Sequence, residues 1–180
     1  MYRIAIVGSF STGKTTLAVR LAEELDLPML PEVAREVIDL GFELDKNATP
    51  EVETLIFLRQ FRNETQHPGF VGDRSLIDVL AYAGWVMDNM EWRKETALWE
   101  TCVDLAHQNL RGQYSHVFFL PIEFPIELDG LRPDDPAFQA EIDSRLRKLL
   151  DIHDIPFVEV GGSVDERMDK IHKELGIAPA

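Results

Sequence analysis

The sequence contains a single cysteine, Cys102, among its 180 residues. One cysteine cannot form an internal disulfide or a C-x-x-C metal site, and the five scattered histidines form no H-E-x-x-H motif. No run of 18 apolar residues occurs, and the first residues lack the apolar segment of a secretory signal peptide. We therefore expect a cytoplasmic protein with no membrane-spanning helix and no structural metal, in which Cys102 is a small core residue.

Positive charge is also scarce, since 18 Lys and Arg face 32 Asp and Glu and leave a formal net charge of −14. This charge repels a nucleic-acid backbone, so sequence-independent binding of DNA or RNA is disfavoured. A small phosphate-bearing ligand is still possible, because a local cluster of basic side chains and N–H groups dominates at contact distance. The length and the 45% hydrophobic content fit a single domain over residues 1–180.

A glycine-rich stretch near the N-terminus, Gly8–Thr15, fits the pattern G-x-x-x-x-G-K-[ST] at every fixed position. An apolar run at Arg3–Val7 predicts a buried strand before it, and apolar residues at helical spacing from Leu17 to Leu25 predict a helix after it. Strand, loop and helix are the context that a phosphate-binding P-loop requires. A glycine-rich turn that matches by chance is the alternative, and the flanking elements argue against it.

Such a loop would bind the phosphates of ATP or GTP. Successive backbone N–H groups and the positive end of the helix dipole attract the phosphate charges, and glycines let the backbone approach them. Lys14 is expected to reach the β- and γ-phosphates, and the Thr15 hydroxyl is expected to hold Mg²⁺. The predicted nucleotide-binding residues are Gly8, Ser11, Thr12, Gly13, Lys14, Thr15 and Thr16.

The rest of the chain alternates short apolar runs with helical patterns. The helical patterns run from Thr49 to about His67, from Ser75 onward with a Ser75/Asp78 capping box, from about Glu91 to Leu110, after Pro136, and after Ser163. Four further strands are predicted within residues 26–31, 70–73, 116–120 and 156–160. This alternation predicts an α/β fold, a P-loop NTPase three-layer sandwich with a five-stranded parallel sheet.

Charged residues follow two of the predicted strands. Because ligands of open parallel sheets bind at the carboxyl ends of the strands, Glu32 and Arg35 are candidates to face the substrate. An exposed, salt-bridged first helical turn is the alternative. Asp73 ends the next strand, where P-loop folds place the acid that completes the Mg²⁺ shell or accepts a proton from the acceptor hydroxyl. A plain cap or turn residue is the alternative for Asp73.

The segment of about residues 121–136 breaks every periodicity. It contains several prolines and acids but only one basic residue, Arg132. We expect a lid that closes over the phosphates and brings the planar Arg132 cation to the charge that develops during transfer.

Two absences narrow the choice among P-loop proteins. The chain lacks the N-K-x-D and D-x-x-G motifs of GTPases, and Asp73 is followed by Arg74 instead of a water-activating glutamate. An acid beside a base favours transfer of phosphate to a bound acceptor over transfer to water. Three functions stay open: a kinase for a small metabolite, an ATPase or switch that acts on a protein partner, and a kinase for a modified base or an end in nucleic acid.

Four stretches together resemble the P-loop kinases related to the nicotinamide riboside kinase domain of NadR, and the wider nucleoside and nucleoside-monophosphate kinase group. They are Gly8–Thr15, Glu32–Arg35, Asp73–Ser75 and Asp129–Arg132. The Asp-Arg-Ser sequence is similar to the strand-end motif of thymidylate and deoxynucleoside kinases, and residues 132–135 are faintly similar to the adenylate kinase lid. The acceptor and the oligomeric state are left open.

The resemblance implies ATP and Mg²⁺ as cofactors and a nucleoside- or nucleotide-like small molecule as the substrate. Lys14 and Thr15 would act on the donor side. Glu32 or Asp73 would orient the acceptor hydroxyl and take its proton, and the division of these two roles stays open. Further expected roles are substrate positioning by Arg35 and Arg74, closure of the lid with Arg132, and metal binding by Thr15 with Asp73.

Overall fold

Five parallel strands lie at the centre of this computed structural model, which describes residues 1–89, 97–126 and 134–178. Their order across the sheet is β2-β3-β1-β4-β5. The carboxyl ends of all five strands therefore lie at one edge of the sheet, where ligands of this architecture bind. The strands are β1 (Arg3–Val7), β2 (Met29–Leu30), β3 (Phe70–Asp73), β4 (His116–Phe119) and β5 (Val158–Glu159).

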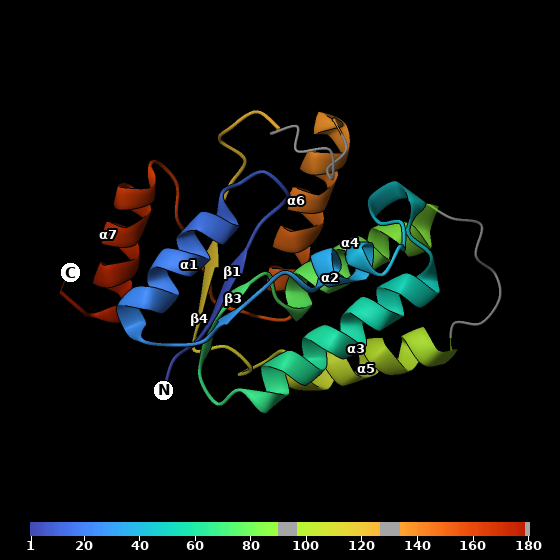
Figure 1. The fold of residues 1–180 in the computed structure, drawn as a ribbon, viewed down its shortest axis with the longest axis horizontal. Helices are drawn as coiled ribbons and strands as arrows, with labels where there is room; N and C mark the ends of the chain where they lie inside the picture. Colours follow the sequence, from blue (N-terminus) through green and yellow to red (C-terminus); the bar gives the residue numbers. More distant parts are fainter. Residues whose placement is uncertain (90–96, 127–133, 179–180) are drawn as a thin grey trace.

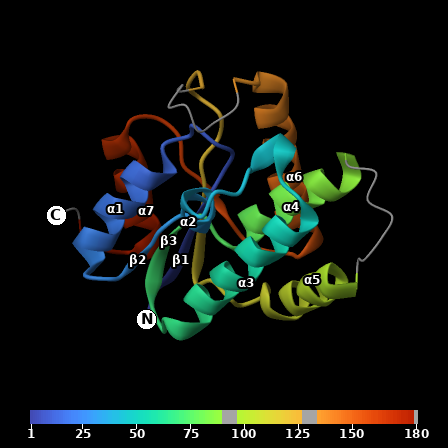
Figure 2. The same cartoon turned by 45° about the vertical axis from the view of Figure 1, so that its right-hand side comes forward.

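Helices cover both faces of the sheet (Figure 1). Helices α1 and α7 lie on one face, and α3 to α6 lie on the other, a separation that the turned view also shows (Figure 2). The predicted three-layer α/β fold with a five-stranded parallel sheet is confirmed. The helices are α1 (Lys14–Leu25), α2 (Val33–Asp39), α3 (Pro50–Gln66), α4 (Leu76–Asn89), α5 (Ala97–Asn109), α6 (Pro136–Ile152) and α7 (Val164–Leu175), with a short 3-10 turn, η1, at Asp45–Asn47.

The central strand β1 is buried on both sides, as the apolar run predicts. Ile4 and Ile6 pack into the core shared with α1 and α7, whereas Ala5 and Val7 pack into the larger core on the other face. Successive side chains of a strand point to opposite faces, so one continuous apolar run fills both cores. The strand that leads into the glycine loop is thereby fixed in position.

Strand register brings three chain segments together at the end of β1. Ile6 pairs with Asp73 of β3, and Val7 pairs with Phe119 of β4. The backbone N–H of Arg74 donates to the carbonyl of Ile6 at 3.2 Å, and that of Leu120 donates to the carbonyl of Val7 at 2.9 Å. The glycine loop therefore starts between the ends of β3 and β4.

One predicted boundary differs from the structure, and two predictions fall on residues that it does not describe. Helix α5 begins at Ala97, and the predicted start near Glu91 falls outside the described residues. The predicted strand over residues 156–160 is shorter, since β5 is an edge strand whose register pairs only with β4 and Pro156 has no N–H to donate. Arg132 and residues 127–133 of the predicted lid also lie outside the described residues. No helix in the described part of the chain is long and apolar enough to cross a membrane.

Candidate active site

The glycine loop turns sharply out of β1. Gly8 has a φ of 153°, and a Cβ at this position would lie 2.6 Å from the backbone oxygen of Leu120. Gly13, directly before α1, has a φ of 84°, in the left-handed region that side chains rarely adopt. Both fixed glycines of the motif are thus required by geometry. Thr12 is buried within the loop, whereas Thr15 and Thr16 are exposed at the start of α1.

Lys14 is folded back over this loop. Its Nζ donates to the Ser9 carbonyl at 2.6 Å and to Thr12 Oγ1 at 3.4 Å, and the residue is only 6% exposed. Burial, together with the nearby Arg74 cation, lowers the pKa of Lys14 to about 8 although neighbouring acids oppose the change. At neutral pH Lys14 is therefore charged inside a loop of N–H groups, an arrangement suited to a polyanion.

Thr15 and Asp73 meet at the start of α1. The Thr15 hydroxyl donates to Asp73 Oδ2 at 2.6 Å, while Oδ1 of the same carboxyl is buried with no hydrogen-bond partner among the described residues. A buried carboxylate oxygen without a partner is costly unless a ligand satisfies it. Oxygen donors are the ligands that Mg²⁺ prefers, and this ion is usually bound by few protein groups plus phosphates. The pair therefore fits the predicted metal site.

A second charge cluster follows the ends of β2 and β3. Arg74 Nε donates to Glu32 Oε1 at 2.5 Å, and Arg35 Nε donates to Glu32 Oε2 at 3.2 Å. Burial alone would raise the pKa of Glu32, but the Arg74 and Lys14 cations and Arg35 outweigh it and lower the pKa to about 2. Glu32 is therefore a fixed anion held between two guanidinium groups. The Glu32–Arg35 salt bridge that the sequence left as an alternative is present, and both residues also line a pocket.

Backbone geometry aims Arg74 into this cluster. Arg74 has a φ of 80°, and its guanidinium carbon lies 4.8 Å from the centre of the Tyr82 ring. A Cβ at Gly72 would lie 2.6 Å from the carbonyl oxygen of Arg74, so the turn needs glycine there. A strained conformation at a non-glycine residue is typical of functional sites. Its result here is a side chain held between Glu32 and an aromatic face.

Asp78 ties α4 to the glycine loop. Its Oδ2 accepts from the backbone N–H of Ser75 at 2.8 Å and from the Ser75 hydroxyl at 3.0 Å. The first of these bonds is one of the two that the predicted capping box requires. Its Oδ1 accepts from the backbone N–H of Gly8 at 3.3 Å, a link that the sequence did not reveal. Burial raises the pKa of Asp78, and Arg74 and Lys14 oppose that rise.

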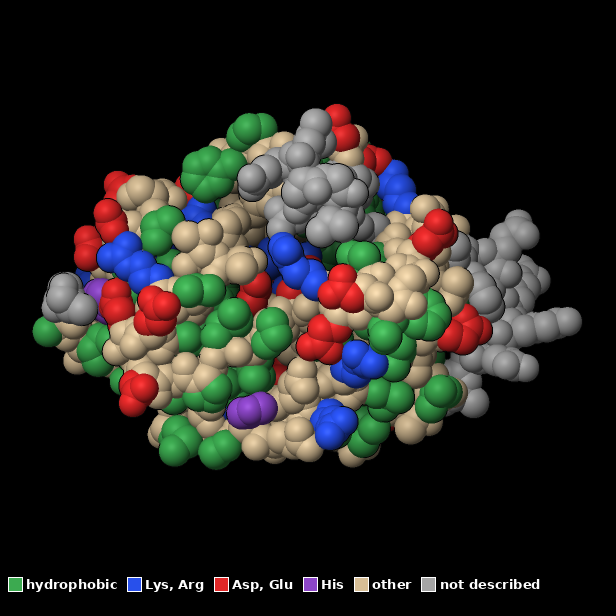
Figure 3. Space-filling view, in the orientation of Figure 1, with side chains coloured by type: hydrophobic (Ala, Val, Ile, Leu, Met, Phe, Trp, Pro, Cys, Tyr) green, Lys and Arg blue, Asp and Glu red, His purple; other side chains and the backbone are tan. Residues whose placement is uncertain are grey.

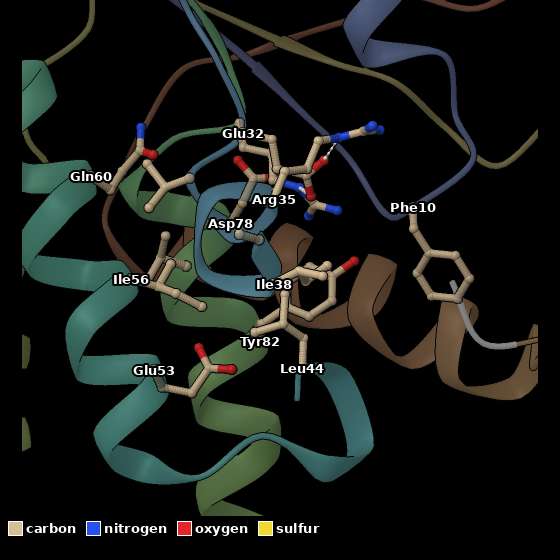
Figure 4. Close-up of a pocket in the computed structure, with 14 residues that line it drawn as sticks. Phe10, Glu32, Arg35, Ile38, Leu44, Glu53, Ile56, Gln60, Asp78 and Tyr82 are labelled. Atoms are coloured by element: carbon tan, nitrogen blue, oxygen red, sulfur yellow. Dashed lines mark hydrogen bonds and ion pairs between the residues drawn. The ribbon is translucent and has the colours of Figure 1, made fainter. Parts of the chain in front are cut away.

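A pocket opens beside these charges, between α2, α3 and α4 (Figure 4). Its volume is about 750 Å³, open mouth included. Figure 4 shows Glu32, Arg35, Asp78 and Gln60 towards one end and Glu53 and Leu44 towards the other, with Ile38, Ile56 and Tyr82 between them. Basic and acidic side chains also gather near the middle of the face in Figure 3. The full lining is Phe10, Glu32, Val33, Ala34, Arg35, Ile38, Leu44, Glu53, Ile56, Gln60, Arg74, Asp78, Val79 and Tyr82.

A buried arginine of α7 also reaches the glycine loop. Arg167 Nη1 donates to the Thr12 carbonyl at 2.6 Å, and Nη2 donates to Glu123 Oε2 at 2.9 Å. Glu123 in turn accepts from the backbone N–H of Gly162 at 2.8 Å. No sequence signal pointed to Arg167, because 155 residues separate it from Thr12.

The structure brings the predicted donor-side and acceptor-side residues to one edge of the sheet. Lys14, Thr15 and Asp73 lie on the side of the glycine loop, and Glu32, Arg35 and Arg74 lie at the pocket. Arg59 and Arg62 of α3 do not line the pocket, and Arg59 pairs with Glu36 at 3.1 Å. The assignment of roles to these residues stays a prediction.

Sequence comparison identifies the family. A family model described as an AAA domain, AAA_28, matches residues 3–167. The chain belongs to the AAA_28 family. No curated protein matches the sequence.

Solved structures share the fold of this AAA_28 chain. The NadR protein in complex with NAD and AMP-PNP aligns with a TM-score of 0.75 and 18% identity over 99% of this chain and 51% of that chain. A deoxyadenosine kinase from M. mycoides with bound dATP aligns with a TM-score of 0.67 and 14% identity. That alignment covers 98% of this chain and 100% of the kinase chain. YorR from Bacillus subtilis, in complex with phosphorylated GDP, aligns with a TM-score of 0.57 and 16% identity. That alignment covers 96% of this chain and 95% of the YorR chain.

These similarities confirm, at the level of the fold, the predicted resemblance to NadR-like and nucleoside kinases. The AAA_28 chain spans about half the length of the NadR chain.

Proposed function

We propose that this chain is an ATP- and Mg²⁺-dependent kinase that transfers the γ-phosphate to a hydroxyl of a nucleoside, nucleotide or related small metabolite. One observation carries the proposal. The consecutive residues Asp73 and Arg74 face two different sites, since Asp73 binds Thr15 of the glycine loop and Arg74 binds Glu32 of the pocket. Consecutive Cα atoms are about 3.8 Å apart, so a phosphate donor and an acceptor bound at these sites would be adjacent.

On the donor side, the glycine loop and Lys14 would hold the ATP phosphates, and the Lys14 ammonium would leave the Ser9 carbonyl for the phosphate oxygens. The Thr15 hydroxyl and Asp73 would hold Mg²⁺, which supplies neutralisation of the phosphate charge when bound. Arg167 would keep the Thr12 carbonyl in place, so that the following N–H groups stay directed at the phosphates.

On the acceptor side, Glu32 would orient the attacking hydroxyl and accept its proton. With a pKa of about 2 Glu32 is ionised throughout the neutral range, and its two arginines fix the direction of its oxygens. A weak base suffices because phosphoryl transfer proceeds through a loose transition state in which the hydroxyl loses its proton late. Asp73 is less suited to this role, since it binds Thr15 and is absent from the pocket lining.

The pocket itself favours transfer to a bound molecule over hydrolysis. Its walls are mostly apolar, with charged groups such as Glu32, Arg35 and Glu53 among them, which is the composition of a small-molecule site. The solved neighbours are in keeping with this proposal, since they include NadR in complex with NR and a deoxyadenosine kinase with bound dATP.

The proposal is tested by incubating the chain with ATP, Mg²⁺ and a panel of nucleosides, nucleoside monophosphates and oligonucleotides, and by identifying phosphorylated products by mass spectrometry. We expect one class of small acceptor to gain a phosphate. Lys14→Ala should abolish turnover while the circular dichroism spectrum stays unchanged. Free phosphate as the sole product would instead favour an ATPase or switch.

A further inference from the structure

The end of the pocket that holds Glu32 has no surplus of positive charge. Figure 4 shows Asp78 at the same end as Glu32 and Arg35. Both guanidinium groups at this end already donate to Glu32, Arg35 through Nε at 3.2 Å and Arg74 through Nε at 2.5 Å. Among the described lining residues these are the two cations, and Glu53 adds a further carboxyl group towards the other end. A phosphate dianion bound here would therefore meet cations that acids already balance.

Asp78 adds a fixed negative charge to this wall although it is fully buried. Its carboxylate accepts from three donors, which are the backbone N–H groups of Gly8 and Ser75 and the Ser75 hydroxyl. The oxygen of that hydroxyl accepts from the backbone N–H of Ile77 at 3.2 Å, so its own proton is directed at Asp78. Three donors match an ionised carboxylate, which can only accept.

The backbone N–H groups at the start of α4 are occupied as well. Free N–H groups at a helix N-terminus attract phosphate, and α4 begins beside the pocket. The N–H of Ser75 donates to Asp78 at 2.8 Å, and that of Leu76 donates to Oε1 of the buried Glu64 at 3.1 Å. The N–H of Ile77 donates to the Ser75 hydroxyl. Two side-chain carboxylates thus use the donors that a phosphate group would need.

The group that reacts beside Glu32 must also bring a proton. With a pKa of about 2, Glu32 is an anion at neutral pH and can only accept a hydrogen bond. An alcohol can donate its proton to such an acceptor. A phosphate monoester, whose second pKa is about 6, is mostly a dianion at pH 7 and has no proton to donate. Its oxygens would instead face the Glu32 carboxylate with like charge.

We propose that the acceptor is an unphosphorylated alcohol, such as a nucleoside, and that Asp78 is a specificity-determining residue that helps to exclude nucleoside monophosphates. The inference rests on the proposed kinase function and narrows its substrate class. Lys14 also acts on the charges at this end, but the proposed function engages it with the phosphates of ATP. The phosphorylated product would then be released instead of being phosphorylated again.

Nucleosides and their own 5′-monophosphates test this exclusion. The pairs are adenosine and AMP, cytidine and CMP, and nicotinamide riboside and its mononucleotide, each used with ATP and Mg²⁺. In any pair with a reactive member, we expect kcat/KM to be at least about tenfold higher for the nucleoside, because like charges placed together cost several kcal/mol. A comparable or higher kcat/KM for the monophosphate would overturn the inference.

An uncharged ligand separates the effect of charge from that of size. The 5′-dimethyl phosphate triester of the same nucleoside is larger than the monophosphate but carries no charge. Both are compared as inhibitors of nucleoside phosphorylation by the wild-type chain, and the triester should have the lower inhibition constant. A triester that inhibits no better than the monophosphate would mean that size excludes the phosphate, and the charge argument would be wrong.

Asp78→Asn removes one negative charge from the pocket wall with little change of shape. The inhibition constant of the monophosphate, divided by KM for the nucleoside, should fall roughly fivefold or more. Glu36→Gln is the matched control, since it removes the same charge from a half-exposed residue of α2 that does not line the pocket, and it should leave this ratio unchanged. Equal ratios in the two variants would contradict the role of Asp78.

The wild-type comparisons decide the matter if Asp78→Asn does not fold. Phosphorylation of neither member in every pair would overturn the kinase proposal and the inference together. Efficient phosphorylation of a monophosphate would overturn the inference alone, because the chain would still be a kinase.

Discussion

Replacement of Arg167 should uncouple the glycine loop from the rest of the fold. The side chain is only 3% exposed and donates to the Thr12 carbonyl at 2.6 Å and to Glu123 at 2.9 Å. Loss of a hydrogen bond from a charged group costs roughly 1.5–3 kcal/mol. For a domain of this size each kcal/mol lowers the melting temperature by about 2–4 °C, so Arg167→Met should melt about 3–12 °C lower.

A stability loss alone would not show that Arg167 positions the loop. Displacement of a phosphate-binding backbone by about 1 Å can cost on the order of a hundredfold in rate, so KM for ATP should rise roughly tenfold or more. KM for the acceptor should change far less, because Arg167 does not line the acceptor pocket. Steady-state kinetics with each substrate varied in turn, together with thermal melting, measure both effects.

Glu123→Gln is the matched control for this experiment. It weakens the contact with Arg167 Nη2 but leaves the bond from Nη1 to Thr12 in place, so its effect on KM for ATP should be clearly smaller. Arg167→Lys keeps the charge but cannot donate to Thr12 and Glu123 together, as the fork of a guanidinium does. Its KM for ATP should therefore lie between those of the wild type and Arg167→Met. A lower melting temperature with an unchanged KM for ATP in Arg167→Met would refute the reasoning.

Three further changes follow from the same site. Because the pKa of Lys14 is about 8, the free chain loses this charge above pH 8, and the Kd for ATP measured by calorimetry should weaken about tenfold between pH 7 and pH 9; a flat profile would contradict the role of Lys14. The depressed pKa of Glu32 stabilises the fold above pH 4.5, and this contribution is lost as the pH falls toward 2. Arg74→Gln should therefore lower the free energy of unfolding, measured with denaturant at pH 7, by roughly 3 kcal/mol. An unchanged free energy of unfolding would mean that the Arg74–Glu32 pair is not formed. Gly8→Ala should lower stability and ATP affinity together, since its Cβ would meet the Leu120 backbone at 2.6 Å; normal values for both would show that the loop has another shape.

The parts of the site that depend on local patterns could be predicted from the sequence. The glycine loop, the strand before it and the acid at the end of β3 all have signals within a few residues of one another. Parallel topology then places Glu32 and Asp73 at the same edge without any further information. The meeting of Thr15 with Asp73 follows from these two facts.

Contacts between distant segments could not be predicted in this way. Arg167 and Glu64 are charged residues within amphipathic helices, where an exposed position is the normal expectation. Arg167 is buried because its partners come from the glycine loop and from Glu123, and Glu64 is buried because Tyr114 and Leu76 N–H surround it. Such burial becomes visible only when the packing of α3, α4 and α7 is known.

The fate of the γ-phosphate tests the central claim most directly. The chain is incubated with γ-labelled ATP and Mg²⁺, with and without a mixture of nucleosides, and the label is followed over time. The account predicts that label appears in a phosphate ester only when acceptor is present, and that release of free phosphate stays slow in both reactions. Rapid release of free phosphate that acceptors neither slow nor divert would contradict it.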